Sequence, residues 1–301
     1  MLSLARLRVL RELRRHGTLA EVAKNLNYTP SAVSQQLAAL EAEAGATLTI
    51  KVGRRLRLTA QGEVLADHAD VLLERMEQAE AELAAMSGQV AGRLRVSSFQ
   101  SVLLALIPQT LSILSEQYPG LRVDVTQYDE ADAADGLFTY DYDLVLGEEY
   151  PGEPVHVHAG VDWRELVLEP MRLALPPEGP WSDPRLRLAD LADAPWVLER
   201  PNLIFGRWAQ NVILEAGFEP DVRFFSSDML LHLHLVEQGH AVALIPDLLS
   251  VTEPARVTLV PLEGDQYRRL LTGVRAGSGN HPAIRAFRAA LEQTYRDVTA
   301  R

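Results

Sequence analysis

Hydrophobic positions near the N-terminus recur at helical spacing, and later positions alternate between strand-like and helix-like patterns. Three apolar stripes in the first part of the chain predict three short helices, at residues 4–15, 19–26 and 30–43. Thr18 and Glu21 have the spacing of a capping box, and Thr29 followed by Pro30 is a typical start for the third helix. The second and third helices therefore form a predicted helix-turn-helix.

A short basic segment follows the third predicted helix. Residues 51–59 alternate cations with Val and Leu around Gly53, which predicts a β-hairpin with the glycine near its tip. Alone, this segment could be a solubilising loop. The third predicted helix carries Ser31, Ser34 and Gln35 on the face opposite its apolar residues, and this face could be an ordinary solvent-facing surface. Together, the helix pair, its caps and the hairpin meet several requirements of a winged helix-turn-helix that binds DNA.

In such a module the third helix would enter the major groove, because small and amide side chains can approach base edges closely. Gln35 could pair with adenine through two hydrogen bonds. The basic hairpin would contact phosphates or the minor groove. The candidate DNA-binding residues are Thr29, Pro30, Ser31, Ser34, Gln35, Gln36, Lys51, Arg54, Arg55 and Arg57.

A long apolar seam follows the hairpin. Between residues 61 and 87 there is no proline and one glycine, and apolar residues repeat every seven positions with a second set offset by four. This pattern predicts one long helix that pairs with a second subunit through Leu65, Leu72, Met76 and Leu83. Packing of the seam on the chain's own core is the alternative. Residues 87–92 have the composition of a hinge.

The remaining residues alternate strand-like and helix-like stretches in two sets. Predicted strands lie at residues 94–97, 121–125, 143–147, 166–175, 196–198, 222–225, 241–246 and 270–274. Predicted helices lie at residues 103–117, 204–216, 229–238 and 282–295. The alternation implies parallel sheets with helices on both faces, arranged as two lobes around a cleft.

The pattern as a whole predicts an α/β protein in three parts. These parts are a winged helix-turn-helix, a linker and dimerisation helix with its hinge, and a two-lobed α/β domain, at residues 1–60, 61–92 and 93–301. The first lobe would hold residues 93–162 and 269–301, and the second lobe residues 163–268.

Charge is distributed unevenly along the chain. The formal net charge is −12, yet residues 1–60 carry +6 and the remaining residues carry −18. A polyanion would be attracted to the basic head and repelled by the acidic body, which favours DNA as the partner of the head. Hydrophobic residues make up 47 % of the chain, enough for packed cores, and no apolar run approaches the ~18 residues of a membrane span.

Residue types also narrow the chemistry. Cysteine is absent, which excludes disulfides, thiol catalysis and cysteine-based zinc sites. The N-terminus interleaves apolar and basic residues, unlike a secretory signal, so we expect a cytoplasmic protein. His156 with His158, and His232 with His234, are spaced like metal pairs, but neither pair has an evident third ligand. No phosphate-binding loop, nucleophile elbow or dinucleotide motif occurs, so we expect no metal and no cofactor.

A dense motif runs through the helix-turn-helix and the hairpin. Its residues are Ala23, Leu26, Thr29, Pro30, Ser31, Ala32, Val33, Ser34, Gln35, Gln36, Leu37, Leu40, Glu41, Gly45, Leu48, Gly53, Arg54, Arg57, Leu58, Thr59 and Gly62. In this motif the segment resembles the LysR-type transcriptional regulators. The family usually has Leu-Phe-x-Arg before the hairpin, where this chain has Leu48-Thr49-Ile50-Lys51. The difference removes one packing contact and replaces a bidentate phosphate ligand with lysine.

The resemblance implies partners as well as a fold. It implies an effector domain similar to a periplasmic binding protein, with a small-molecule effector of unknown identity between the lobes. It also implies a homodimer or homotetramer, a pseudo-palindromic site on double-stranded DNA, and RNA polymerase as a partner. Activation and repression are equally compatible with it.

Loops that follow predicted strands supply the candidate effector contacts. Backbone N–H groups and hydroxyls in residues 97–101 would suit a carboxylate or another anion, with an ordinary helix cap as the alternative. Loops 147–148, 199–202 and 226–229 lie at the ends of other strands. The candidate effector-binding residues are Ser98, Phe99, Gln100, Ser101, Gly147, Asn202 and Ser227.

Two other functions stay open beside that of a ligand-responsive regulator. One is a constitutive DNA-binding protein whose body only oligomerises. The other is an enzyme with an incidental helix-turn-helix, although no reactive constellation stands out in the sequence, so we expect no enzyme.

Overall fold

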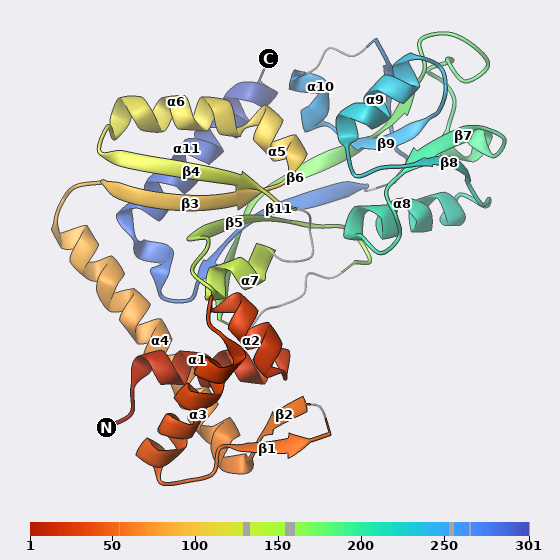
Figure 1. The fold of residues 1–301 in the computed structure, drawn as a ribbon. Helices are drawn as coiled ribbons and strands as arrows, with labels where there is room; N and C mark the ends of the chain where they lie inside the picture. The colour runs from red at the N-terminus through yellow and green to blue at the C-terminus, as the bar shows by residue number, and fades with distance from the viewer. Residues whose placement is uncertain (54, 129–132, 154–159, 253–255, 265, 301) are drawn as a thin grey trace. The chain divides into compact units, whose positions relative to one another are not determined.

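The computed structural model describes residues 1–53, 55–128, 133–153, 160–252, 256–264 and 266–300. The chain folds into two compact units. The first unit consists of residues 1–89 with two short segments, 138–140 and 275–282. The second unit holds residues 90–137, 141–274 and 283–301. Figure 1 labels the helices and strands of both units.

The first unit begins with the three predicted helices. They are α1 (Leu4–His16), α2 (Leu19–Asn25) and α3 (Pro30–Ala44). The Thr18 hydroxyl accepts a hydrogen bond from the Glu21 amide at 3.3 Å, and the Thr29 hydroxyl accepts one from the Ala32 amide at 3.2 Å. These bonds satisfy amides that a helix start leaves without partners, so the caps at Thr18 and Thr29 are confirmed. Of the predicted capping box only this half forms among the described residues, because the Glu21 side chain makes no bond back to the Thr18 amide.

The hairpin is built from β1 (Thr49–Val52) and β2 (Arg55–Leu58), which pair in antiparallel fashion. Its base is fixed by Glu41, whose carboxylate accepts hydrogen bonds from the Leu48 and Thr49 amides at 2.8 and 3.0 Å. The Thr49 hydroxyl donates to the same oxygen at 3.2 Å. Thr49, which stands where the family usually has Phe, therefore supplies a polar contact in place of an apolar one.

The long predicted helix is α4 (Ala60–Met86). Its first turns belong to the core of the head, where Ala66 and Ala69 are fully buried and Leu65 is partly buried. Farther along, the seam is exposed, by 44 % at Leu72, 44 % at Met76 and 69 % at Leu83. Thus the start of the predicted seam, Leu65 included, packs on its own chain, and the rest leaves an apolar stripe on the helix surface.

The second unit contains a seven-stranded mixed sheet. Its strands are β3 (Gly92–Ser98), β4 (Leu121–Gln127), β5 (Leu144–Glu149), β6 (Val161–Leu175), β9 (Ala243–Pro246), β10 (Thr258–Pro261) and β11 (Tyr267–Arg275). Strand β3 is parallel to β4 and β5, whereas β11 is antiparallel to β5, and β6 is antiparallel to β9 and β10. The prediction of parallel sheets therefore holds for β3, β4 and β5 and is wrong for β6, β9, β10 and β11. A period-two pattern predicts a strand but not its direction.

Two hydrophobic cores divide this unit into lobes. In the first lobe, β3 and β5 pack with α5 (Gln100–Ala105), α6 (Ile107–Gln117) and α11 (Pro282–Thr299). In the second lobe, β9 packs with β7 (Pro195–Leu198), α8 (Ile204–Glu215) and α9 (Met229–Glu237), and β8 (Asp221–Phe225) pairs with β7.

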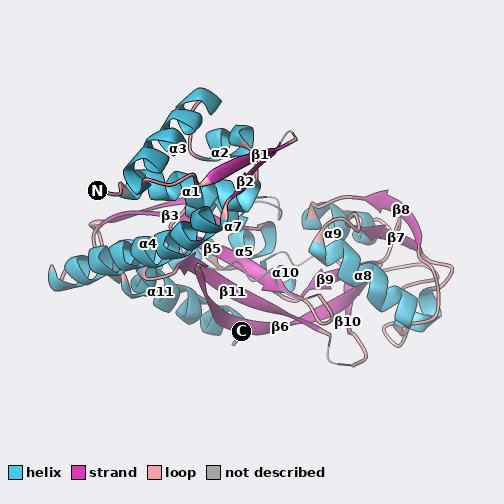
Figure 2. Cartoon of the chain, turned by 90° about the horizontal axis from the view of Figure 1, so that it is seen from below, coloured by secondary structure: helices cyan, strands magenta, loops and turns pink. Residues whose placement is uncertain are grey.

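The long strand β6 belongs to both lobes. Leu166 and Val167 pack against the first core, and Met171 and Leu173 lie in the second. Figure 2 shows β6 and β11 as long strands that extend toward β9 and β10.

Several smaller elements differ from the prediction. The single helix predicted at residues 103–117 is two helices, α5 and α6, because Pro108 is the second residue of α6 and a proline ring cannot continue a helix through the preceding turn. Two short helices, α7 (Ala133–Phe138) and α10 (Leu248–Thr252), and strand β10 had no predicted counterpart. No helix in the described part of the chain combines the length and apolarity that a membrane crossing requires.

Candidate functional sites

The outer face of α3 carries the predicted recognition stripe. Val33, Leu37 and Leu40 are buried in the head core. Ser31, Ser34 and Gln35, as well as Thr29 and Pro30 at the start of the helix, are exposed. This face of α3 consists of small and amide side chains, so the helix can approach a partner closely and donate or accept hydrogen bonds there.

Two residues of the predicted stripe also have structural partners. The Gln36 side chain is half-buried and accepts a hydrogen bond from Arg6 Nε at 3.1 Å, so it ties α3 to α1. The Thr29 hydroxyl caps α3 and lies 3.0 Å from the Ser31 hydroxyl. We therefore expect these two residues to position the stripe, with Ser34 and Gln35 available for direct contacts.

Strand β2 presents two arginines on the side of the hairpin that faces away from the head core. Arg55 and Arg57 are two residues apart on β2 and are exposed, whereas Leu56 and Leu58 pack against the head core. The Leu56 amide donates to the Gly17 carbonyl at 3.1 Å, which fixes the hairpin to the turn between α1 and α2. Lys51 on β1 is exposed as well, but it lies opposite Leu56 and therefore on the other side of the hairpin. Arg54, also a predicted DNA contact, lies outside the described residues.

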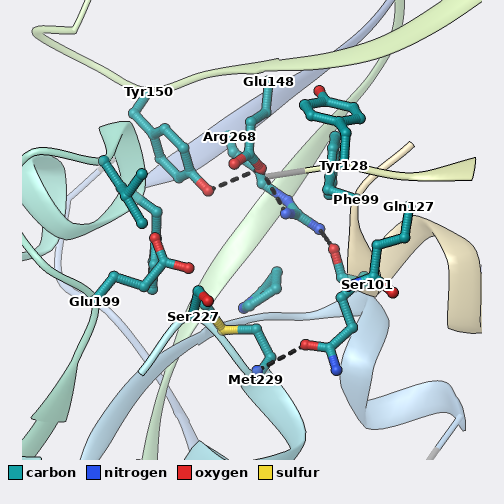
Figure 3. Close-up of a pocket in the computed structure, with 14 residues that line it drawn as sticks. Phe99, Ser101, Gln127, Tyr128, Glu148, Tyr150, Glu199, Ser227, Met229 and Arg268 are labelled. Carbon is teal, nitrogen blue, oxygen red and sulfur yellow. Dashed lines mark hydrogen bonds and ion pairs between the residues drawn. The ribbon is translucent and has the colours of Figure 1, made fainter. Parts of the chain in front are cut away.

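A cavity of about 60 Å³ lies between the two lobes of the second unit. It receives side chains from the first lobe, such as Phe99 and Tyr128, and from the second, such as Glu199 and Met229. Figure 3 shows these side chains directed toward a common space. Of the predicted effector contacts, the structure brings together Phe99, Gln100, Ser101 and Ser227.

Three predicted effector contacts do not line the cavity. Ser98 is fully buried, and no described group hydrogen-bonds its hydroxyl. The indole ring of Trp163 packs so closely on Gly147 that a Cβ at this position would lie 2.9 Å from the ring. Asn202 is exposed beside the cavity, and the next residue, Leu203, contributes to the lining instead. Each of these three residues is next in sequence to a residue that lines the cavity. The end of a predicted strand indicates which loop reaches the cavity, but not which residue of that loop points into it.

Arg268 of β11 is the central polar group of the cavity. Its guanidinium donates to Glu169 and to Glu148, each at 2.7 Å, and to the Ser101 hydroxyl at 2.8 Å. Burial alone would lower the pKa of Arg268, but the Glu169 carboxylate and the other negative groups around it raise the pKa above its usual value. The guanidinium therefore remains charged, and its hydrogen bonds fix the positions of Glu148, Glu169 and Ser101 at the cavity.

Aromatic rings form much of the cavity wall. The Tyr150 hydroxyl donates to Glu148 at 3.0 Å, and its ring stacks on Trp208 with a centroid distance of 5.0 Å. The rings of Phe99 and Tyr128 meet edge to face at 6.4 Å. The rings are held by packing and hydrogen bonds, so they present preformed apolar surfaces to any occupant.

One side chain of the cavity lining, that of Gln100, joins the two lobes. The Gln100 amide nitrogen donates to Asp228 at 2.8 Å, and its oxygen accepts from the Met229 amide at 2.7 Å. Asp228 also caps α9 by accepting from the Leu230 amide at 3.0 Å. The hydrogen bond from Gln100 is the main cause that lowers the pKa of Asp228. Separation of the lobes would break the bonds made by Gln100.

Sequence reasoning missed Arg268, Tyr128 and Tyr150. The two tyrosines directly follow the observed strands β4 and β5, which run two residues beyond the predicted ones. The carboxyl ends of those strands are therefore the signal that could have indicated them. Arg268 lies within β11, and only the tertiary pairing of β11 with its neighbours brings it to the cleft.

The histidine pairs form no metal centre in the described part of the chain, where no group of three potential ligands occurs. The His232 ring is buried, with Nε2 2.8 Å from the Ser226 carbonyl, and burial lowers its pKa. His234 is exposed and lies near Glu237. His156 and His158 lie outside the described residues.

A winged helix-turn-helix with an exposed polar recognition face, joined in one chain to a two-lobed domain with an interlobe cavity, defines a DNA-binding protein with a ligand-binding domain. Comparison with known families agrees. Residues 4–63 match the bacterial regulatory helix-turn-helix protein of the lysR family, and residues 87–296 match the LysR substrate binding domain. The chain belongs to the LysR family and is a DNA-binding transcriptional regulator with an effector-binding domain.

Individual relatives are distant but align over most of the chain. The transcriptional regulator MetR of Escherichia coli K12 is 26 % identical over 95 % of this chain and 89 % of its own length. The dual regulator GltC of Bacillus subtilis is 24 % identical over 79 % of each chain. These relatives are named as regulators of transcription.

Solved structures share the fold. A full-length OxyR variant of Pseudomonas aeruginosa matches with a TM-score of 0.65 and 21 % identity, covering 97 % of this chain and 95 % of that chain. CbnR, a LysR family transcriptional regulator, matches with a TM-score of 0.57 and 20 % identity, covering 96 % of this chain and 100 % of that chain.

Proposed function

We propose that this protein controls transcription at a few pseudo-palindromic promoter sites in response to a small molecule bound between its lobes. The observation that carries the proposal is the exposed face of Ser31, Ser34 and Gln35 on α3, next to a hairpin that exposes Arg55 and Arg57 on one side. The α3 side chains would read base edges in a major groove, and the arginines would bind phosphates or the minor groove.

We propose a homodimer, or a homotetramer built from dimers, as the active form. The exposed apolar stripe at Leu72, Met76 and Leu83 of α4 supports this, because a helix that leaves such a seam in water gains stability from a partner helix. Two heads related by a two-fold axis would bind two inverted half-sites. RNA polymerase is the proposed downstream partner.

We propose that effector binding alters the geometry of the lobes. Gln100 hydrogen-bonds from the first lobe to Asp228 and Met229 of the second, so a ligand that enters the cavity competes with or rearranges these bonds. A ligand that binds one lobe arrangement more tightly shifts the population toward it, and the change would reach the DNA-binding heads through the oligomer. The proposal requires no catalytic step, metal or cofactor, and it places the protein in the cytoplasm.

The alternative of a constitutive DNA-binding protein predicts no ligand response. The cavity lined from both lobes favours the responsive regulator, because a body that only oligomerises has no need of preformed polar and aromatic groups in its interior.

Capture of randomly sheared genomic DNA on the purified full-length protein, followed by sequencing, tests the proposal. We expect a few sharp peaks that contain inverted half-sites. The double variant Arg55→Glu/Arg57→Glu should lose this enrichment, and Arg223→Glu, which alters an exposed arginine of the body, should retain it. Recovery of DNA without any enriched sequence would contradict promoter-specific binding.

A further inference from the structure

Two short segments of the ligand-binding sequence fold as parts of the first unit. They are residues 138–140, at the end of α7, and residues 275–282, which begin at the last residue of β11. Both fall within the stretch that matches the LysR substrate binding domain. Within the first unit they contact α1 and α4, so sequence from the ligand-binding domain is built into the DNA-binding part of the chain.

Helix α1 contacts the first of these segments through arginines on one face. Arg8, Arg11 and Arg15 are spaced by three and four residues, so they lie on the same side of the helix. Arg8 Nη2 donates hydrogen bonds to the carbonyls of Phe138 and Thr139, at 3.2 and 2.8 Å. The guanidinium carbon of Arg15 lies 3.1 Å from the centre of the Phe138 ring, and that of Arg11 lies 5.2 Å from it. We call this set of contacts the arginine clamp.

Tyr140 extends the arginine clamp to α4. Two cations lie over its ring, with Cζ of Arg8 at 4.0 Å and Cζ of Arg275 at 4.2 Å from the ring centre. Its hydroxyl hydrogen-bonds to Glu77 of α4, and burial together with that carboxylate raises the pKa of Tyr140, so the hydroxyl keeps its proton. Glu77 also accepts a hydrogen bond from Arg275 Nε at 2.8 Å. The φ of Tyr140 is +63°, a backbone conformation that residues other than glycine rarely adopt unless their surroundings hold them there.

The second segment packs on α4 at backbone distance. Gly277, with a φ of +89°, precedes the short helix η2 (Ser278–Asn280), and a Cβ at this position would collide with the Glu74 carbonyl of α4. Ser278 is buried, and its hydroxyl donates to the Arg275 carbonyl at 2.7 Å. The segment is therefore fixed to the same part of α4 that carries Glu77.

Both segments are continuous with strands that line the interlobe cavity. Residues 138–140 precede β5, which carries the lining residue Glu148 toward its other end. Strand β11 carries the lining residue Arg268 near its start and ends at Arg275. Between these two arginines the strand rises about 23 Å, at about 3.3 Å per residue. Each strand therefore has one end at the cavity, and its other end leads into the first unit.

The two strands form a hydrogen-bonded pair. Strands β5 and β11 are antiparallel neighbours, with Leu144 opposite Val274. At the cavity end, Arg268 donates to Glu148 at 2.7 Å and ties the two strands together. Packed elements of this kind move as units and do not deform continuously, so a ligand that displaces Glu148 or Arg268 displaces both strands.

Helix α1 in turn supports the DNA-binding elements of the head. Arg6 Nε donates to the Gln36 side chain of α3 at 3.1 Å. The Leu56 amide of the hairpin donates to the carbonyl of Gly17, directly after α1, also at 3.1 Å. A change in the contacts of α1 therefore alters the setting of both α3 and the hairpin.

We propose that residues 138–140 and 275–282 couple the interlobe cavity to the DNA-binding head within one chain. A ligand that displaces β5 and β11 changes the arginine clamp, and the clamp in turn changes the setting of α1. The proposal rests on the proposed function, because it supplies a route for the ligand response. Coupling between two sites is reciprocal, so DNA bound to the head also alters β5 and β11.

Reciprocity allows a test without a known effector. Hydrogen–deuterium exchange of the full-length protein is measured by mass spectrometry, with and without a duplex that contains a site recovered by genomic capture. The amides to follow are at the cavity ends of the two strands, residues 146–149 and 267–270, away from the arginine clamp. In the unaltered protein we expect DNA to change their exchange rates about fivefold or more, the lower end of typical coupling between sites.

Two variants interrupt the arginine clamp. Arg8→Gln removes a cation from above the Tyr140 ring and the guanidinium that bonds to residues 138–140, and Tyr140→Leu removes the ring and the hydroxyl. Each should reduce the DNA-dependent change at the cavity ends to less than about twofold, while the protein still binds the site. Arg14→Gln is the matched control on α1, because the described partners of Arg14 are carboxylates of α4, and it should leave the change as in the unaltered protein.

The proposal is overturned if DNA leaves exchange at the cavity ends of both strands unchanged in the unaltered protein. It is also overturned if the change is as large in a folded clamp variant as in the unaltered protein, because the coupling would then bypass the clamp. A thermal melt identifies a variant that does not fold, and the other clamp variant then decides. Failure of the genomic capture to enrich any site would remove the proposed function, whereas enriched sites with unchanged strands would remove only this route.

Discussion

Arg268 shows how a single residue can organise a site that sequence patterns do not reveal. It is buried on β11, and its three hydrogen bonds join Ser101 and Glu148 of the first lobe to Glu169 on the strand shared by both lobes. Glu169 in turn accepts a hydrogen bond from the Leu248 amide at 2.7 Å. Removal of the guanidinium would leave two buried carboxylates without their cation, which is costly in a low-dielectric interior.

We therefore predict that Arg268→Met lowers the free energy of unfolding by about 3–5 kcal/mol. The neighbouring Arg269 pairs with Glu149 and Glu165 in a far more exposed position, so Arg269→Met should change the free energy by less than about 1 kcal/mol. Urea denaturation of both variants followed by circular dichroism measures the difference. Equal effects of the two substitutions would show that the buried network contributes no special stability.

A second residue-scale prediction concerns His232. Burial holds its pKa below the value in the unfolded chain, opposed by the hydrogen bond to Ser226 and by nearby Asp228. The unfolded state then binds the proton more readily, so the contribution of His232 to stability is complete above pH ~6.5 and is lost as the pH falls below that value. We expect the loss of stability between pH 7.5 and 5.5 to be smaller in His232→Gln, measured by urea unfolding at both pH values. An identical pH dependence in the two proteins would exclude His232 as its source.

At the scale of elements, periodic patterns predicted most helices and strands, and the failures have identifiable causes. The caps at Thr18 and Thr29 placed α2 and α3 because each is a local signal. The direction of β11 and the sharing of β6 between two lobes depend on contacts distant in sequence, which no local pattern contains. Pro108 was a local signal for the break between α5 and α6 that the apolar pattern of residues 103–117 outweighed.

The effector site was predictable only in part for the same reason. Phe99, Gln100, Ser101 and Ser227 follow strand ends and were found, whereas Arg268 lies inside a strand and reaches the cleft through sheet pairing. Gly147 was assigned to the site because it ends a strand, but the indole ring of Trp163 occupies the space beside it.

The exposed stripe of α4 leads to a prediction at this scale. Met76→Glu/Leu83→Glu places charge in the stripe and should shift the protein from a dimer toward a monomer, since each leucine or methionine buried at an interface contributes about 1.5–3 kcal/mol. Ala85→Glu introduces the same charge at an exposed position away from the stripe and should leave the assembly unchanged. Sedimentation velocity at micromolar concentration measures both. A double variant that remains dimeric would place the dimer interface elsewhere.

At the scale of the whole molecule, the charge difference between head and body matches their functions, DNA binding by the head and effector binding by the body. The head carries +6 and would be attracted to DNA, while the remaining residues carry −18 and would be repelled by it. This separation favours approach to DNA with the head forward and keeps the acidic body, with its interlobe cavity, away from the phosphates.

The central claim is that α3 reads DNA sequence while the hairpin binds the backbone. The most direct test is a competition titration of a site recovered by genomic capture against a scrambled site, across a series of salt concentrations. We predict that Gln35→Ala costs about 1–3 kcal/mol on the recovered site and little on the scrambled one. Arg57→Ala should weaken both and reduce the salt slope by about one. The account would be contradicted if Gln35→Ala weakened binding to both sites equally and the unaltered protein preferred neither site. This helix would then not read DNA sequence.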